Sequence, residues 1–308
     1  MTATTPQQAS AAGGRTTPTV KRVHGRALRR FARRFLRQRG AVVAFAFLLL
    51  ILFVALFAGL LAPYDPEAQD LRNSMMSPLE SSGHLLGTDE LGRDTLSRLM
   101  FACRISLLAP VIAVSVAFVL GVPLGLISGF AGGAVDTVLM RITDAVMSFP
   151  PLILAIAVIA VLRPSLTNAM LAVGFVFAPR FLRLVRGTVL SVREETYIEA
   201  ARTIGTPSPV IIVRHVLPNV LSPLIVQISL AAGFSLLAEA GLSFLGLGVQ
   251  PPDASWGSMM GRGFREMSQQ TWLIVWPGLM IVLTVLAFNV LGDGLRDSLG
   301  REIRDGRS

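Results

Sequence analysis

Long uncharged stretches separated by short polar segments dominate the chain. Residues 41–62 hold 22 positions without a charged side chain, enough for an α-helix to cross a hydrocarbon core of about 30 Å. Five further stretches follow, and 164–179 is among the shortest because Arg163 and Arg180 bound it. We expect membrane-spanning helices at residues 41–62, 105–134, 147–162, 164–179, 216–238 and 271–292. The pattern predicts an all-α membrane protein with six transmembrane helices.

The residues before the first stretch are polar and basic. Residues 1–20 have no apolar period and bury too little apolar surface to offset the entropy of ordering. Residues 21–39 contain nine basic side chains and no acid. We therefore expect residues 1–40 to form a disordered, basic cytoplasmic tail. Residues 41–62 are too long and their basic preamble too extended for a signal peptide, so we expect them to remain as a membrane helix.

The net charge of +9, from 28 basic and 19 acidic residues, would by itself be compatible with nucleic-acid binding. Its distribution indicates membrane topology instead. With both termini cytoplasmic, 21 of the basic residues lie on the cytoplasmic side and seven outside, as the positive-inside rule requires. We expect a multi-pass protein in contact with membrane lipids and without a nucleic-acid partner.

The polar segment 63–104 is expected on the outer side of the membrane. Its residues 95–105 have apolar positions at helical spacing behind Asp94 or Thr95, which are good N-cap residues, so a short amphipathic surface helix is predicted. We interpret the charges of this segment as a solvated, salt-bridged face. Residues 105–292 are expected to form the transmembrane core, followed by a cytoplasmic tail at 293–308.

The second stretch carries a helix-packing signal. Gly121, Gly125 and Gly129 recur at every fourth position, which places them on one face of a helix and permits close contact with a neighbouring helix.

A cytoplasmic amphipathic helix is predicted at residues 135–149. Arg141 and Asp144 can pair on it because they are three residues apart. Pro150 and Pro151 should then bend the chain into the third span.

Several classes of chemistry are disfavoured. The single cysteine, Cys103, excludes a disulfide scaffold within the chain, and the three histidines are too scattered for a local metal motif. A phosphate-binding P-loop needs a glycine before its lysine, whereas the only lysine, Lys21, follows Val20. No signature of a nucleophile and its base occurs either, which disfavours a membrane-embedded hydrolase. We predict a chain without catalytic residues, metal or bound cofactor, so ATP used for transport must bind another chain.

The loop at residues 193–218 is the most informative segment. Residues 193–204 suit a helix, Gly205 is placed to end it, and Pro207 or Pro209 is placed to begin another. Ala200 and Ala201 would let another protein approach closely, with Glu199 and Arg202 as charged contacts. We interpret the loop as a docking element rather than a plain surface helix.

Three polar residues near the membrane are candidates for a gate or pathway: Glu239, Ser243 and Asn289. Glu239 ends the fifth span, before a Gly- and Pro-rich segment that suits a partly re-entrant outer loop. It either belongs to an outer gate or lies at the interface as a cap or arginine partner. Asn289, with Asp293, either lines the path or caps the last helix and pairs with Arg296.

The loop resembles a known motif. Glu199-Ala200-Ala201, three residues, Gly205, and then Leu217-Pro218 is similar to the cytoplasmic EAA loop of permease subunits of binding-protein-dependent ABC importers. Residues 86–94, 236–252, 256–257 and 286–297 resemble the dipeptide, oligopeptide and nickel permeases, specifically the DppC/OppC-like partner. The resemblance covers nearly everything from Gly40 onward. His215 departs from the aliphatic residue usual in the motif.

The resemblance implies a type I ABC importer permease fold in a bacterial cytoplasmic (inner) membrane. A second homologous permease subunit would complete the channel, two ABC ATPase subunits would hold ATP and Mg, and an extracytoplasmic substrate-binding protein would deliver solute. The residues implied in coupling to an ATPase are Glu199, Ala200, Ala201 and Gly205, supported by Arg202, Leu217 and Pro218.

The resemblance also favours a cargo. It implies uptake of dipeptides or short oligopeptides by alternating access, with nickel or a nickel complex as the alternative inside the same family. From another class, a secondary transporter or channel would use buried ionisable relays, for which only Glu239 is a candidate.

Overall fold

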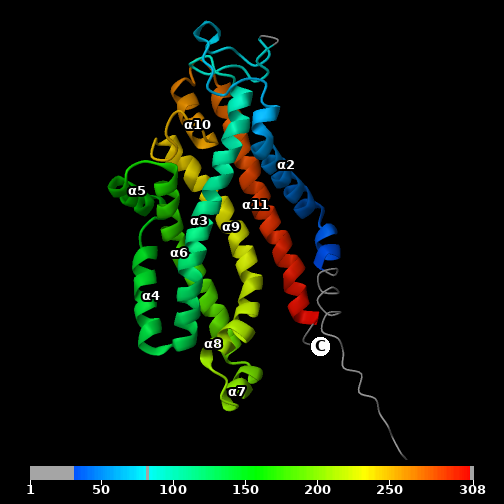
Figure 1. Ribbon diagram of the computed structural model, residues 1–308, viewed down its shortest axis with the longest axis vertical. Coiled ribbons are helices and arrows are strands. Elements are labelled where there is room, and N and C mark those ends of the chain that lie inside the picture. Colours follow the sequence, from blue (N-terminus) through cyan, green and yellow to red (C-terminus); the bar gives the residue numbers. More distant parts are fainter. Residues whose placement is uncertain (1–30, 81–82, 306–308) are drawn as a thin grey trace, which may run out of the picture.

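The computed structural model describes residues 31–80 and 83–305, and its regular structure is helical (Figure 1). The long helices run side by side along the long axis of the molecule, whereas α7 and α8 lie at one end and α10 near the other (Figure 1). The elements are α2 (Arg39–Leu61), η1 (Leu71–Asn73), α3 (Thr95–Ala131), α4 (Gly133–Met147), α5 (Pro151–Leu162), α6 (Leu166–Arg193), α7 (Thr196–Thr203), α8 (Ser208–Ile211), η2 (Ile212–Val216), α9 (Leu217–Phe244), α10 (Trp256–Arg265) and α11 (Trp272–Asp305).

Five helical segments in the described residues are long and apolar enough to cross a membrane: α2, α3, α6, the stretch from α8 to α9, and α11. The predicted third span, 147–162, is not a straight helix. Its first residue ends α4, and most of it is the short α5, which meets α4 at 91°, so the predicted bend before this span is confirmed. Pro150 and Pro151 lie at this break. Because proline removes a backbone donor and restricts the residue before it, the two prolines separate α4 from α5. The chain has six spans only if this bent pair counts as one.

Helix α3 is longer than predicted. It begins at Thr95, so the expected separate surface helix at 95–105 is the first part of the second membrane helix. The predicted cap is confirmed, because the Asp94 carboxylate accepts from the Ser97 backbone N–H at 2.8 Å.

Helix α6 extends well past Pro179, where the fourth span was predicted to end. Arg180, which suggested the end, lies inside the helix, and the next two arginines along it, Arg183 and Arg186, are paired with carboxylates of α4. Arg186 donates to Asp136 from Nε at 2.5 Å and from a terminal nitrogen at 2.7 Å. The predicted partner of Asp144 was Arg141. Asp144 pairs instead with Arg183 of α6. These ion pairs hold α4 against α6.

The predicted glycine face of α3 is confirmed as the contact with α6. A Cβ on Gly121 would lie 2.5 Å from the Ala178 carbonyl oxygen, and one on Gly125 would lie 2.7 Å from the Leu182 carbonyl oxygen. Gly174 of α6 approaches the backbone of α3 in the same way. The two helices therefore touch backbone to backbone along this line.

The segment before α3 folds over the end of the bundle. Asp94 also accepts from His84 Nδ1 at 2.9 Å, and the Gln270 side chain donates to the Met75 carbonyl at 2.8 Å. The prediction that the charges of this segment are solvated is wrong for Arg98. Its side chain is only 2% exposed, and its Nε lies 3.6 Å from Asp89 Oδ2. Burial lowers the pKa of the nearby Arg262 guanidinium, and Arg93 contributes in the same direction.

Candidate functional site

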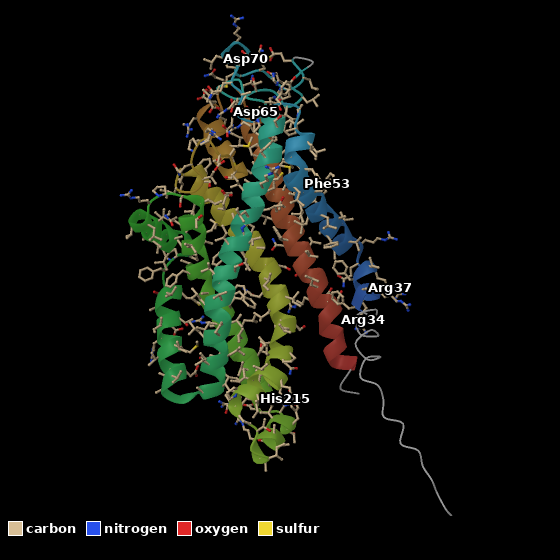
Figure 2. All side chains as sticks on the ribbon, in the orientation of Figure 1. Arg34, Arg37, Phe53, Asp65, Asp70 and His215 are labelled. Atoms are coloured by element: carbon tan, nitrogen blue, oxygen red, sulfur yellow. The ribbon has the colours of Figure 1, made fainter. Side chains whose placement is uncertain are left out.

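The loop predicted to dock a partner lies at the end of the molecule opposite the 63–94 segment. Figure 2 shows His215 at this end and Asp65 and Asp70 at the other. The expected helix 193–204 is interrupted, because α6 ends at Arg193 and α7 begins at Thr196. The loop is thus a short helix attached to the base of two long ones.

Gly205 ends α7 as predicted. Its φ is +80°, in the left-handed region that glycine adopts at low cost. The Gly205 N–H donates to the Arg202 carbonyl at 2.9 Å, and the Thr206 N–H donates to the Ala201 carbonyl at 3.0 Å. This pair of bonds is a Schellman motif, which satisfies the last carbonyls of the helix and turns the chain sharply.

The two faces of α7 have different surroundings. Ile198 is fully buried and Ala201 is only 8% exposed, so both pack against the bundle. Glu199 and Ala200 are exposed. The expectation that both alanines are open to a partner is therefore wrong for Ala201. The exposed Arg202 lies with its guanidinium carbon 5.1 Å from the centre of the Phe130 ring of α3.

The second half of the loop continues directly into a membrane helix. Residues 208–244 form one helical stretch through α8, η2 and α9, with Pro209 in its first turn. Leu217 is half-buried and Pro218 is exposed. Because Pro218 has no N–H to donate one turn back, the ladder shifts locally, and the Leu217 N–H bonds to the Ile212 carbonyl in a π turn. The second half of the 193–218 loop, from Ser208 onward, and the fifth predicted span are therefore a single element.

Glu239 lies inside α9, which continues to Phe244. Its side chain is fully buried, and Ser243 Oγ donates to its Oε1 at 2.6 Å. Ser243 Oγ in turn accepts from the Val249 N–H at 3.1 Å, in the loop before α10. Glu239 and Ser243 thus connect α9 to this loop, and Glu239 is neither at the interface nor paired with an arginine. Its Oε2 has no partner among the described residues.

Asn289 is half-buried and faces α9, where a Cβ on Gly233 would lie 3.5 Å from its Oδ1. The predicted helix end at Asp293 is wrong, since α11 runs on to Asp305. In the described part of the chain, no ion pair joins Asp293 to Arg296.

The sequence analysis missed a second site between α5, α6 and α9. A cavity of about 290 Å³ opens at the break between α4 and α5, and its one charged lining residue is Arg180. Arg180 was predicted to flank the fourth span, yet it lies in the middle of α6. The three-residue spacing of Arg180, Arg183 and Arg186 is the signal that could have revealed an arginine face within this helix.

Comparison with known proteins agrees with these features. Residues 121–305 match the family model described as "binding-protein-dependent transport system inner membrane component". Residues 27–78 match "N-terminal TM domain of oligopeptide transport permease C".

Curated relatives cover nearly the whole chain. The chain is 44% identical over 276 residues to a glutathione transport system permease protein of Pectobacterium atrosepticum, covering 90% of this chain and 91% of the relative. It is 41% identical over 283 residues to the di/tripeptide transport system permease protein of Pseudomonas aeruginosa, with coverages of 90% and 93%. A probable D,D-dipeptide transport system permease protein of Escherichia coli is 43% identical over 258 residues, with coverages of 84% and 86%.

Among solved structures, inward-facing conformations of the MetNI methionine ABC transporter are similar in fold. One matches with a TM-score of 0.56 at 19% identity, covering 66% of this chain and 97% of that chain. Another matches with a TM-score of 0.52 at 18% identity, with coverages of 63% and 93%.

Proposed function

This chain belongs to the family of binding-protein-dependent transport system inner membrane components, as a non-catalytic, multi-pass permease subunit of an ABC importer, and we propose that its cargo is dipeptides or short oligopeptides. The cargo assignment is supported by relatives whose names specify di- and tripeptides, D,D-dipeptides and glutathione. They match along the whole core and not at one motif. Family membership also implies ATPase and binding-protein partners.

The finer assembly is part of the proposal. A second homologous permease completes the pathway, two ABC ATPase subunits hold ATP and Mg, and an extracytoplasmic binding protein docks on the 63–94 side. Both termini are cytoplasmic. The supporting observations are the excess of basic residues on the α7 side and the location of the docking loop opposite the 63–94 segment (Figure 2).

The observation that carries the mechanism is the single helical stretch from α8 to α9. In our proposal, Glu199, Ala200 and Arg202 present the exposed face of α7 to a groove in one ATPase. Ala201 attaches α7 to the bundle, Gly205 sets the turn, and Leu217 and Pro218 join the loop to α9. Closing of the ATPases then biases the bundle between inward- and outward-facing states through contacts that differ between the two.

The test is mass spectrometry of the proteins that copurify with this chain after gentle solubilisation of its native membrane. We expect a second permease, ATPases with Walker motifs and a peptide-type binding protein, and uptake of a labelled dipeptide when these are reconstituted. A nickel-type binding protein would replace the peptide assignment by the nickel alternative. Recovery of the chain alone, under conditions that preserve other complexes, would contradict the assembly and favour the channel or secondary-transporter class.

Glu239 and Ser243 are proposed to belong to the outer gate. We expect Glu239→Gln to lower uptake about tenfold for all substrates, because it places an amide donor where Oε2 makes no hydrogen bond in the described residues, and a buried unpaired donor costs about 1–3 kcal/mol. Uptake is measured in reconstituted vesicles. Glu266→Gln, at the end of α10, is the control that neutralises a less buried carboxylate. Uptake by Glu239→Gln equal to that of the wild type would remove the gate assignment.

Asn289 remains a pathway candidate on its position alone. It faces Gly233 across the α9–α11 contact, where a change in helix spacing would alter its surroundings.

A further inference from the structure

The cavity between α5, α6 and α9 is lined by a cation without an ion-pair partner in the described residues, midway along a helix long enough to span a membrane. Arg180 follows Leu166, the first residue of α6, by 14 positions, which places it about 21 Å along the helix from that end. A guanidinium within a membrane-spanning helix is costly when it faces lipid, so such residues face protein or a water-filled path. We infer that this cavity opens to the translocation pathway and not to lipid.

Arg180 differs from its neighbours on the same helix. Arg183 and Arg186 each pair with a carboxylate of α4. Arg180 lies opposite the break at Pro150 and Pro151, where α4 has ended. Within the described residues it makes no ion pair and no hydrogen bond. The bundle therefore compensates two of the three arginines and leaves the third without an anion.

The contacts that Arg180 does make leave its donors available. Its guanidinium carbon lies 5.1 Å from the centre of the Phe177 ring and 5.5 Å from that of the Phe234 ring. Aromatic rings interact with the flat face of a guanidinium, whereas its N–H donors point outward in the plane. That fork matches a carboxylate in two parallel hydrogen bonds.

The remaining lining of the cavity is apolar, with Leu152, Val176 and Leu237 among its side chains. A volume of about 290 Å³ falls near the lower limit of small-molecule sites. We propose that Arg180 binds the carboxylate of a peptide in transit, while the apolar walls contact its side chain without selecting among sequences. This inference rests on the proposed function and names the chemical group that the permease itself recognises.

The first test compares uptake of alanylalanine with that of its C-terminal amide by the reconstituted complex. The binding protein is the same in every sample, so its own preference cancels when the acid-to-amide ratio of a variant is divided by that of the wild type. We expect Arg180→Gln to lower this ratio at least tenfold. Arg180→Lys, which keeps the charge but lacks the fork, should give an intermediate value. Arg163→Gln removes an exposed arginine between α5 and α6 and should leave the ratio unchanged.

The possible results separate the two hypotheses. A wild-type complex that takes up neither peptide would overturn the proposed cargo and the Arg180 site with it. Uptake by the wild type, with an unchanged ratio in Arg180→Gln, would overturn only the Arg180 site. An equal loss of acid and amide uptake would assign Arg180 a structural role. If Arg180→Gln does not assemble, the acid-to-amide ratio of Arg180→Lys is compared with that of the wild type. A lower ratio supports the Arg180 site, and an unchanged ratio overturns it.

A second test detects binding without transport. Leu237 lines the cavity and is 53% exposed, whereas the only native cysteine, Cys103, is buried. In the assembled Leu237→Cys complex, we expect alanylalanine to slow alkylation by a maleimide, read by mass spectrometry of residue 237, and the amide to have little effect. Adding Arg180→Gln should abolish the protection. Equal protection by acid and amide would contradict a carboxylate site.

Discussion

Substituting Gly205 by valine is expected to abolish solute-stimulated ATP hydrolysis and uptake while the protein still reaches the membrane. Space is not the obstacle, because a Cβ at Gly205 would meet nothing within 4 Å. The obstacle is the φ of +80°, which costs a β-branched residue roughly 1–2 kcal/mol or more. To avoid this cost, the Schellman turn must open, and the exposed face of α7 is then misdirected.

Two variants make this prediction specific. Gly205→Asn should retain most activity, since asparagine adopts the left-handed conformation far more readily than valine. Gly187→Val also adds a side chain in open space, but at a helical position of α6, and should behave as the wild type. Hydrolysis and uptake are measured on the reconstituted complex. Unchanged activity in Gly205→Val would refute the role of this turn in coupling.

Substituting Gly125 by leucine is expected to destabilise the folded protein strongly. The added Cβ alone would lie 2.7 Å from both the Leu182 carbonyl oxygen and the Val185 Cβ. Neither atom can rotate away, so α3 and α6 must separate along their shared face. Overpacking of a core costs about 1–3 kcal/mol and sometimes more. A backbone clash in the central helix pair belongs to the upper end.

The measurement is the melting temperature of the detergent-purified chain. It is monitored by fluorescence-detected gel filtration of samples heated to increasing temperatures. Gly241→Leu is the matched control, because this helical glycine of α9 has nothing within 4 Å of its Cβ position. We expect a loss of several degrees or of the monodisperse peak for Gly125→Leu alone. Equal melting of the two variants would mean that the α3–α6 contact is not close-packed in the membrane protein.

Local signals in the sequence predicted much of this structure. The glycine spacing in α3, the Asp94 cap and the Gly205 turn each depend on residues within one or two helical turns, and each is confirmed. The uncharged stretches located the membrane helices for the same reason. The type I permease fold and the peptide-importer family, inferred by resemblance, are supported by the matched family model and relatives.

The errors arose where distant residues decide the outcome. The end of α6 was misplaced because Arg180 was taken to end the span, whereas the helix continues to Arg193 and Asp136 compensates its later Arg186 from 50 residues away. The burial of Ala201 could not be distinguished from the exposure of Ala200 in sequence, since adjacent alanines differ only in which face of α7 meets the bundle. Arg180 escaped notice because its lack of a carboxylate partner is a property of the packed helices.

The uninterrupted stretch from α8 to α9 also has a mechanical consequence. Its 37 residues make a rod about 55 Å long. A tilt of about 10° around the midpoint would displace each end by about 5 Å in opposite directions, by the geometry of a rod of this length. In the proposed assembly, such a lever would need no relay of side-chain rearrangements between α7 and Glu239. Its effectiveness depends on stiffness, so in the proposed mechanism the energy of nucleotide binding would reach the outer loop only as far as this helix resists bending.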